Sequence, residues 1–320
     1  MRNMEILITE PTDFSQRALN SLSKIGFVKK GPFSKEELIN EVGNTNILIV
    51  RLGHLINQPI FDNAKNLKYI LTPTTGLNHI DVDNANKRGI HIISLKGEHE
   101  FLDSIPSTAE HTWALLMSLI RKIPQACDDV KMGNWDRDKF KGNNLNTLSL
   151  GVFGFGRVGK QVAKIAKCFN MKIYVYDKKK IETKLYNVVN SKSELFQKSD
   201  IVSIHLDLNK GNINIVDKEL LRFLKKGAFL INTSRGELIN EDDLVTFLEN
   251  KTLAGVALDV IHNENATTSK FNNPIISYAK NNNNAIITPH IAGATLQSMK
   301  MTEEFVVDKF INILNQRTHI

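Results

Sequence analysis

Three polar side chains of complementary chemistry stand out in the second half of the sequence. Arg235, Glu264 and His290 each follow, within a few positions, a short β-branched or apolar segment. An arginine can bind a carboxylate through two parallel hydrogen bonds, and a histidine can exchange a proton near neutral pH. A glutamate beside that histidine can fix its tautomer and stabilise its protonated form. Any one of these residues could be structural, but their repeated placement after expected strands indicates a shared site.

A glycine-rich loop precedes these residues, with glycines at Gly154, Gly156 and Gly159. Residues 149–153 before it are typical of a strand, and residues 160–169 after it have a helical pattern. In that context the glycines permit a tight turn and let the backbone approach a pyrophosphate at the helix N-terminus. The loop therefore predicts dinucleotide binding.

An acidic residue in the expected position supports this interpretation. Asp177 directly follows the expected strand 173–176 and lies 21 positions past Gly156. A carboxylate there can accept both ribose hydroxyls of the adenosine half of a dinucleotide, and it would repel a 2′-phosphate. The sequence therefore favours NAD over NADP, although the basic run Lys178–Lys180 weakens that preference.

The same loop almost matches the phosphate-binding loop of nucleotide hydrolases. Gly154 and the pair Gly159-Lys160 have its spacing, but Gln161 stands where a magnesium-binding Ser or Thr is needed. The strand, the helix and Asp177 together favour the dinucleotide interpretation. A dinucleotide that accepts a hydride, together with an arginine, a histidine and a glutamate, could oxidise a 2-hydroxy acid.

Two sets of alternating strand and helix patterns must position these residues. Such alternation indicates right-handed crossovers and parallel sheets, so we expect two α/β units in one chain. The carboxyl ends of parallel strands line one edge of a sheet, where Arg235, Glu264 and His290 would meet. The expected strands are residues 6–9, 47–50, 68–71 and 90–94 in the first set, and 149–153, 173–176, 201–205, 229–232, 256–260 and 286–288 in the second. Expected helices include 34–42, which opens with a capping box, 107–121 and about 295–314.

The chain resembles the D-isomer-specific 2-hydroxyacid dehydrogenases, the family of D-lactate, glycerate, glyoxylate and phosphoglycerate dehydrogenases. The motifs that carry the resemblance cover the chain nearly from end to end, in family order. They are Thr75–Asp81, Ser107–Thr112, Gly154–Gly159, Thr233–Gly236, Ala257–Val260 and Thr288–Gly293. The resemblance implies an α/β fold with two doubly wound parallel sheets. A Rossmann NAD-binding domain, residues 104–295, would be inserted into a flavodoxin-like substrate domain formed by residues 1–103 and 296–320.

The resemblance also implies a role for each matching residue. Arg235 would hold the substrate carboxylate and keto oxygen, and His290 would be the acid/base with Glu264 as its partner. Asp259 would contact the nicotinamide carboxamide and Asp177 the adenosine ribose. The expected NAD-binding residues are Gly154, Gly156, Arg157, Val158, Gly159, Asp177, His205, Thr233, Asp259 and Gly293. The expected substrate-binding residues are Arg51, Thr75, Gly76, Leu77 and Arg235. No metal site is expected.

Two questions stay open at this stage. One is whether the chain is an enzyme, as the intact Arg235, Glu264 and His290 favour, or a catalytically weak nicotinamide-binding regulator like the corepressor branch of the family. The other is the substrate, which could be 3-phosphoglycerate or another small hydroxy acid. The resemblance further implies a homodimer formed through the NAD-binding domain. Trp135 is either a contact with the second subunit or a solvent-shielded anchor of its own loop.

Composition excludes several other classes. With 42% hydrophobic residues among 320, the chain is too apolar for a disordered protein, and two cysteines are too few for a disulfide scaffold. The formal charge of +7 is spread along the chain, so we expect a small-anion substrate and no nucleic-acid partner. No apolar run reaches the length of a membrane span, and the first residues do not resemble a secretory signal. We therefore expect a cytoplasmic protein, with Cys127 and Cys168 as reduced, buried thiols.

Overall fold

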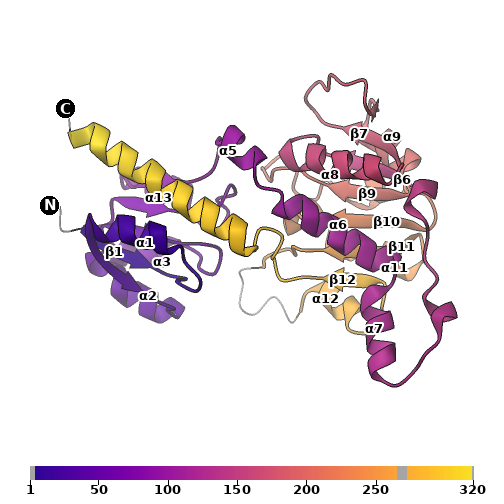
Figure 1. Cartoon of the computed structure of the whole chain (residues 1–320), viewed down its shortest axis with the longest axis horizontal. Coiled ribbons are helices and arrows are strands. Elements are labelled where there is room, and N and C mark those ends of the chain that lie inside the picture. Colours follow the sequence, from indigo (N-terminus) through magenta and orange to yellow (C-terminus); the bar gives the residue numbers. More distant parts are fainter. Residues whose placement is uncertain (1–3, 265–271, 319–320) are drawn as a thin grey trace. The chain divides into compact units, whose positions relative to one another are not determined.

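The computed structural model describes residues 4–264 and 272–318 (Figure 1). The chain divides into two compact units. Unit 1 contains Met1–Ser104 and Ala294–Ile320, and unit 2 contains Ile105–Gly293. Both ends of the chain thus belong to the same unit, and unit 2 is a continuous segment between them.

Unit 1 is built on a five-stranded parallel sheet with the order β2-β1-β3-β4-β5. The strands are β1 Met4–Ile8, β2 Gly26–Lys30, β3 Ile47–Ile49, β4 Tyr69–Leu71 and β5 His91–Ile93. This is the flavodoxin-like order, in which the chain reverses direction across the sheet between β1 and β3. Ligands of such sheets bind at that reversal, beyond the carboxyl ends of the strands.

Helices cover both faces of this sheet because its strands are apolar on both sides. Ile6 and Ile8 of β1 pack in one buried cluster with Phe310, while Leu7 between them packs in the opposite one. Ser34 accepts a hydrogen bond from the backbone N–H of Glu37 and so caps the second helix, as expected. The helices are α1 Gln16–Ser23, α2 Lys35–Glu41, α3 Gln58–Asn63, α4 Val82–Lys87, α5 His99–Asp103 and α13 Leu296–Thr318.

Unit 2 is built on a seven-stranded parallel sheet with the order β12-β11-β10-β9-β6-β7-β8. The strands are β6 Ser149–Phe153, β7 Lys172–Tyr176, β8 Asn187–Val188, β9 Ile201–Ile204, β10 Ala228–Asn232, β11 Leu253–Leu258 and β12 Ala285–Ile287. This is the Rossmann order with one additional strand, and its reversal lies between β6 and β9. All five residues of the central β6 are buried, which explains why no charged residue interrupts it.

Helices of unit 2 bury the two faces of this sheet in separate clusters. Adjacent residues of β10 point to opposite sides, since Leu230 belongs to one cluster and Ile231 to the other. Trp113 stacks on Phe169, with 4.9 Å between ring centroids, and joins the helix before the sheet to the helix after β6. The helices are α6 Ser107–Ile120, α7 Ile123–Lys131, α8 Arg157–Cys168, α9 Lys192–Lys198, α10 Lys218–Leu221, α11 Glu241–Glu249 and α12 Pro274–Ala279.

The predicted fold class is confirmed: both units are doubly wound parallel α/β sheets. Two strands were not predicted, and both lie at sheet edges. β2 has the sequence Gly-Phe-Val-Lys-Lys and no fully buried residue, and both residues of β8 are exposed. An edge strand with so little buried surface carries no apolar run in its sequence. The expectation of buried thiols is wrong, because Cys127 and Cys168 are both exposed.

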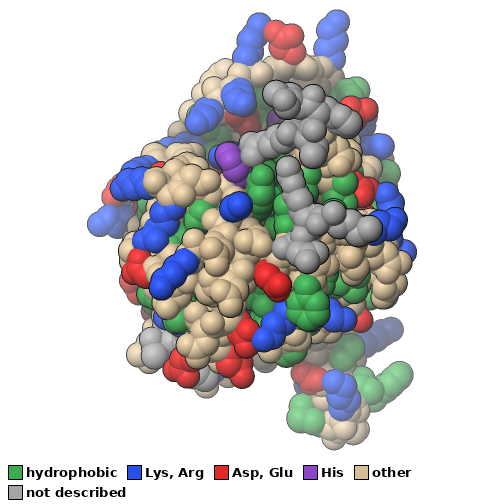
Figure 2. All heavy atoms as spheres, turned by 90° about the vertical axis from the view of Figure 1, so that its left-hand side faces the viewer, with side chains coloured by type: hydrophobic (Ala, Val, Ile, Leu, Met, Phe, Trp, Pro, Cys, Tyr) green, Lys and Arg blue, Asp and Glu red, His purple; other side chains and the backbone are tan. Residues whose placement is uncertain are grey.

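The molecular surface mixes charges of both signs. On the face drawn in Figure 2, lysine and arginine side chains are interspersed with aspartate and glutamate and do not gather into one basic patch. Within the described residues, no helix is long and apolar enough to cross a bilayer. Nor do three His, Cys, Asp or Glu side chains of those residues gather where they could hold a metal ion.

Candidate active site

The glycine loop joins β6 to α8 in a turn that other residues would distort. Gly154 has a φ of +96°, and a Cβ there would lie 2.3 Å from the carbonyl oxygen of His205. A Cβ at Gly159 would lie 2.1 Å from the carbonyl oxygen of Gly154. These two glycines therefore allow the strand, the turn and the helix to pack in close contact.

Gly156 has a different environment, because no atom lies within 4 Å of the position that its Cβ would take. It is the residue before α8, so the backbone N–H groups of the first helical turn point toward this open space. An open surface at a helix N-terminus suits a pyrophosphate that approaches the backbone. The residues present therefore fit the phosphates of a dinucleotide.

Replacing Gly159 or Gly156 with alanine is expected to affect different properties: the first stability, the second NADH binding. In Gly159→Ala the new methyl group would overlap a backbone oxygen, so we expect a loss of about 1–3 kcal/mol in the free energy of unfolding. Gly156→Ala should unfold at the wild-type temperature, because its φ of −76° suits any residue, but it should bind NADH about tenfold more weakly. Thermal unfolding and fluorescence titration measure the two effects, and equal destabilisation by both variants would contradict this division.

Asp177 lies at the end of β7, beside the glycine loop. One carboxylate oxygen accepts a hydrogen bond from the backbone N–H of Phe155 at 2.8 Å, and the other accepts one from Lys179 at 2.9 Å. The negative charge is therefore fixed next to the loop that would hold the phosphates. Of the other residues predicted to bind NAD, Val158 lies in the first turn of α8, and Arg157 donates a hydrogen bond to the carbonyl oxygen of Ile105 at 3.1 Å.

His205 follows β9, and its imidazole is buried. Its Nε2 lies 2.8 Å from the Ser203 hydroxyl, and burial lowers the pKa of the ring from 6.5 to about 3. The ring is therefore neutral near pH 7. Its main-chain oxygen is the atom that Gly154 approaches, which connects His205 to the glycine loop through the backbone.

Arg235 begins the loop after β10. Its main-chain oxygen accepts a hydrogen bond from the Asn232 side chain at 2.8 Å, and its guanidinium donates one to the carbonyl oxygen of Ser234 at 2.6 Å. A Cβ on the next residue, Gly236, would lie only 2.0 Å from the backbone of Ile261. Gly236 therefore lets the Arg235 loop pack against the loop after β11, which leads to Glu264.

His290 and Glu264 are in direct contact. The Nδ1 atom of His290 lies 2.6 Å from Oε1 of Glu264, and both side chains are about one-fifth exposed. His290 has a φ of +55°, an uncommon conformation for a non-glycine residue, and its N–H donates to the main-chain oxygen of Asp259 at 2.8 Å. The structure thus brings together two of the three predicted catalytic residues as a hydrogen-bonded pair.

Asp259, which is 1% exposed, holds the loop that carries His290. Its carboxylate accepts hydrogen bonds from the Thr288 hydroxyl and from the backbone N–H groups of Ile291 and Ala292 at 2.9 and 2.7 Å. His111 of α6 lies beside this group, with Nε2 3.0 Å from the Thr288 hydroxyl. These contacts show a positioning role for Asp259, and its predicted contact with the nicotinamide stays a prediction.

Two further residues predicted to bind NAD lie at the same edge of the sheet. Thr233 is buried, and its hydroxyl lies 2.8 Å from that of Thr112 in α6. Gly293 is exposed, with no atom within 4 Å of a Cβ built there. Their roles toward the cofactor stay predictions.

Glu241, at the start of α11, is a buried acid whose role the sequence does not predict. It accepts hydrogen bonds from the backbone N–H of His262 at 2.8 Å and from the side chain of Asn273. Burial raises the pKa of its carboxyl group. Glu241 therefore anchors the chain shortly after β11 and again before α12, on either side of Glu264 in the sequence. Its sequence gives no signal of this, since an acid at a helix start is ordinary.

Apart from Arg235, the predicted substrate-binding residues lie in unit 1. Within the described part of the chain, the backbone N–H groups of Gly76 and Leu77 donate no hydrogen bond, so they can bind a carboxylate. Thr75, just before them, is exposed. Arg51 follows β3, and its guanidinium contacts the carboxylate of Glu303 and donates to the carbonyl oxygen of Thr12 at 3.1 Å.

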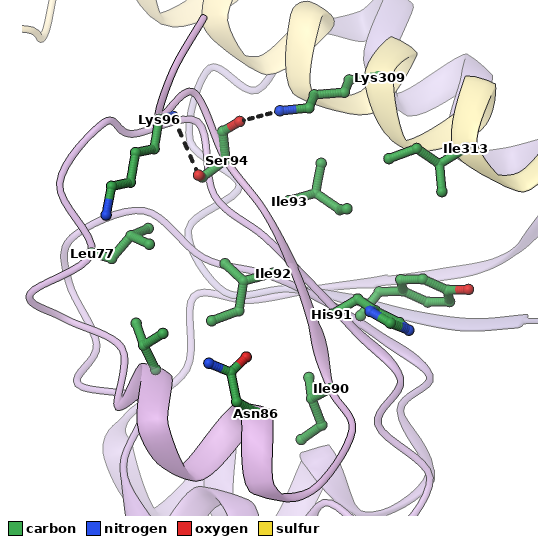
Figure 3. A pocket seen from close by; sticks show the side chains of 12 residues that line it. Leu77, Asn86, Ile90, His91, Ile92, Ile93, Ser94, Lys96, Lys309 and Ile313 are labelled. Atoms are coloured by element: carbon green, nitrogen blue, oxygen red, sulfur yellow. Dashed lines mark hydrogen bonds between the residues drawn. The ribbon is translucent and has the colours of Figure 1, made fainter.

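A cavity of about 570 Å³ lies beside the edge strand β5 of unit 1 (Figure 3). Leu77 lines it, together with residues of α4, β5 and α13. Lys309 of α13 donates a hydrogen bond to the carbonyl oxygen of Ser94 at 3.0 Å, and Lys96 lines the cavity near Leu77 (Figure 3). Lys309 is also paired with Glu98, with 2.6 Å between Nζ and Oε1, so Lys96 is the residue that supplies positive charge beside Leu77.

The sheet orders and the glycine loop define an α/β protein of the dinucleotide-binding class. Residues 113–292 match the family model described as D-isomer specific 2-hydroxyacid dehydrogenase, NAD binding domain. The chain belongs to the D-isomer specific 2-hydroxyacid dehydrogenase family, as the motifs predicted.

Relatives with different substrates resemble the chain to a similar degree. A hydroxypyruvate reductase of Thermotoga maritima is 30% identical over 314 residues, which cover 98% of this chain and 99% of the relative. A D-3-phosphoglycerate dehydrogenase of Methanocaldococcus jannaschii is 32% identical over 97% of this chain, which spans only 57% of that relative's length. A D-lactate dehydrogenase structure from Aquifex aeolicus, complexed with NAD and lactic acid, has a TM-score of 0.84 at 27% identity, with 98% and 96% of the two chains covered. These relatives are named as enzymes, and their names differ in the substrate.

Proposed function

We propose that the chain is an NAD-dependent enzyme that interconverts a D-2-hydroxy acid and its 2-keto acid. The observation that carries this proposal is the His290–Glu264 pair, 2.6 Å apart, at the same edge of the sheet as the glycine loop and Arg235. Family membership and the names of the relatives support it.

The residues of the pair divide the acid/base work. Glu264 accepts the Nδ1 proton of His290, so the exchangeable proton lies on Nε2. During reduction His290 donates the Nε2 proton to the keto oxygen of the substrate, which becomes the hydroxyl group. Glu264 stabilises the imidazolium before this transfer. Arg235 binds the substrate carboxylate and orients the keto group toward His290. NADH, when bound, would supply the hydride that C2 of the keto acid accepts.

The reaction is tested by NADH oxidation with a panel of 2-keto acids. The panel should contain glyoxylate, pyruvate, hydroxypyruvate, phosphohydroxypyruvate and larger keto acids. We expect saturable turnover of at least one of them, with a hydroxy acid as product that has the D configuration wherever C2 is a stereocentre. Clear NADH binding without turnover of any member would contradict the proposed activity and favour the regulator.

We propose that Asp177 makes NAD the preferred cofactor. Its carboxylate is fixed by two backbone N–H groups beside the glycine loop, where it would repel a 2′-phosphate. In Asp177→Asn we expect the ratio of kcat/KM for NADPH to that for NADH to rise about tenfold or more. The matched control is Glu182→Gln, a nearby acid whose side chain is 78% exposed, which should leave the ratio unchanged. A wild-type protein that uses both cofactors equally would contradict the proposal.

We propose a homodimer formed through unit 2. The segment around α7, which projects from the layers of unit 2 in Figure 1, exposes Met132 (72%) and Trp135 (89%). Large exposed apolar side chains of this kind are typical of protein interfaces. Light scattering should give a dimer for the wild type and a monomer for Trp135→Asp. The control Phe27→Ser, at an exposed aromatic residue of unit 1, should stay dimeric. A monomeric wild type would contradict this interface.

The cytoplasmic location expected from the sequence stays a prediction.

A further inference from the structure

The reversal of unit 1, between β1 and β3, lies at the same sheet edge as the predicted substrate-binding residues Arg51, Gly76 and Leu77. Glu10 follows β1, and Arg51 and Gly53 follow β3. In flavodoxin-like sheets the crevice between these two loops is the place where a ligand with a phosphate is usually bound. The groups that could bind an anion there are the backbone N–H groups of the second loop and the Arg51 guanidinium.

Glu10 already occupies the backbone donors of this crevice. Its Oε2 accepts the N–H of Arg51 at 2.7 Å, and its Oε1 accepts the N–H of Gly53 at 2.6 Å. The hydroxyl of Thr9 donates to Oε2 as well, at 2.7 Å. Backbone N–H groups that converge on one carboxylate form the arrangement that would otherwise bind a phosphate. The chain's own carboxylate thus fills the place of a ligand anion.

The charge of Arg51 is also compensated from within unit 1. Its guanidinium contacts the carboxylate of Glu303, whose side chain is 1% exposed, and lies 5.8 Å from the ring centroid of Phe14. Glu303 accepts a second hydrogen bond from the backbone N–H of Ser15 at 2.8 Å. Among the described residues Arg51 pairs with Glu303, whereas Glu10 has no ion-pair partner, so the negative charge of Glu10 stays uncompensated at this crevice.

One anion site remains available at this edge. The backbone N–H groups of Gly76 and Leu77, after the neighbouring β4, donate no hydrogen bond within the described part of the chain. Lys96 lines the same cavity as Leu77 and supplies positive charge there (Figure 3). The edge of unit 1 can therefore accept one carboxylate and opposes a second anionic group.

We propose that Glu10 is a specificity-determining residue and that the substrate is an unphosphorylated 2-keto or 2-hydroxy acid whose carboxylate is its only anionic group. Arg51 then positions the loop after β3 through Glu303 and does not bind substrate directly. This inference rests on the proposed dehydrogenase function. It distinguishes the chain from an enzyme that acts on phosphoglycerate. The relatives include both a phosphoglycerate dehydrogenase and a hydroxypyruvate reductase.

Hydroxypyruvate and phosphohydroxypyruvate test the proposal, because they differ only by the phosphate group. We expect kcat/KM to be higher for hydroxypyruvate by about 100-fold or more, since like charges in an interface are strongly unfavourable. A preference for phosphohydroxypyruvate would overturn the inference and leave the proposed function intact. Failure of all keto acids in the panel would instead overturn the proposed function.

Neutralising Glu10 tests the cause of the preference. In Glu10→Gln the ratio of the two kcat/KM values should fall by about tenfold or more, because the negative charge at the crevice is gone. Glu36→Gln, at an exposed acid of α2, should keep the wild-type ratio and serves as the matched control. If Glu10→Gln does not fold, Glu303→Gln, which frees the charge of Arg51, should lower the ratio in the same direction. An unchanged ratio in a folded variant of either acid would overturn the role of these carboxylates.

Discussion

His290→Ala is expected to reduce kcat by about 10²- to 10⁴-fold, the range typical of a lost general acid–base group. The imidazole is the group of the His290–Glu264 pair that can carry a proton to the substrate oxygen, and alanine leaves nothing in its place. NADH affinity should stay within a few-fold of wild type, because the glycine loop lies elsewhere along the sheet edge. Stopped-flow reduction and NADH titration separate the two quantities.

The control for this experiment is His99→Ala, at an exposed histidine that begins α5 of unit 1. It should keep wild-type kcat. If folded His290→Ala retained more than a tenth of the wild-type kcat, His290 would not be the acid/base. A parallel loss in His99→Ala would point to a general effect on the protein.

Arg235→Gln is expected to lower kcat/KM for the keto acid by about 100-fold or more. A forked guanidinium makes two charge-assisted hydrogen bonds to a carboxylate, each contributing about 1.5–3 kcal/mol. Arg235→Lys should recover only part of the loss, because an ammonium keeps the charge without the planar fork. Steady-state kinetics with the best keto acid of the panel measures the ratio.

Arg222→Gln provides the matched arginine control. Arg222 forms an exposed ion pair with Glu219, with both side chains about 60% exposed, and should be replaceable without effect. If Arg235→Lys were as active as wild type, positive charge alone would suffice and the forked carboxylate contact would be contradicted.

Features that depend on local sequence could be predicted well. The capping box of Ser34 and Glu37 forms as expected, and the glycine loop stands between a buried strand and a helix. These signals are local because the partners lie within a few residues of one another. The fold class followed from the alternation of strands and helices, which requires parallel sheets. The edge strands β2 and β8 could not be predicted, because they bury too little surface to require an apolar sequence pattern.

Side-chain partners far apart in the sequence could not be predicted. The Arg51–Glu303 pair joins residues 252 positions apart, and nothing in the spacing of either indicates the other. The same holds for Glu241, which anchors both His262 and Asn273. His290 and Glu264 could be placed at one edge, but their 2.6 Å contact depends on the positive φ of His290 and on Asp259, which fix the loop. The cofactor and substrate roles of the remaining predicted residues stay predictions.

We propose that NADH reduces a 2-keto acid beside Arg235 and His290, at the edge of the sheet of unit 2. The most direct test uses NADH labelled with deuterium at C4 on the transferred position, with hydroxypyruvate or the best chiral-product keto acid of the panel. Mass spectrometry and chiral chromatography then locate the label and the configuration of the product. We expect one deuterium at C2 of the D-hydroxy acid for each NADH consumed. Deuterium absent from C2, or present in the L-enantiomer, would contradict it.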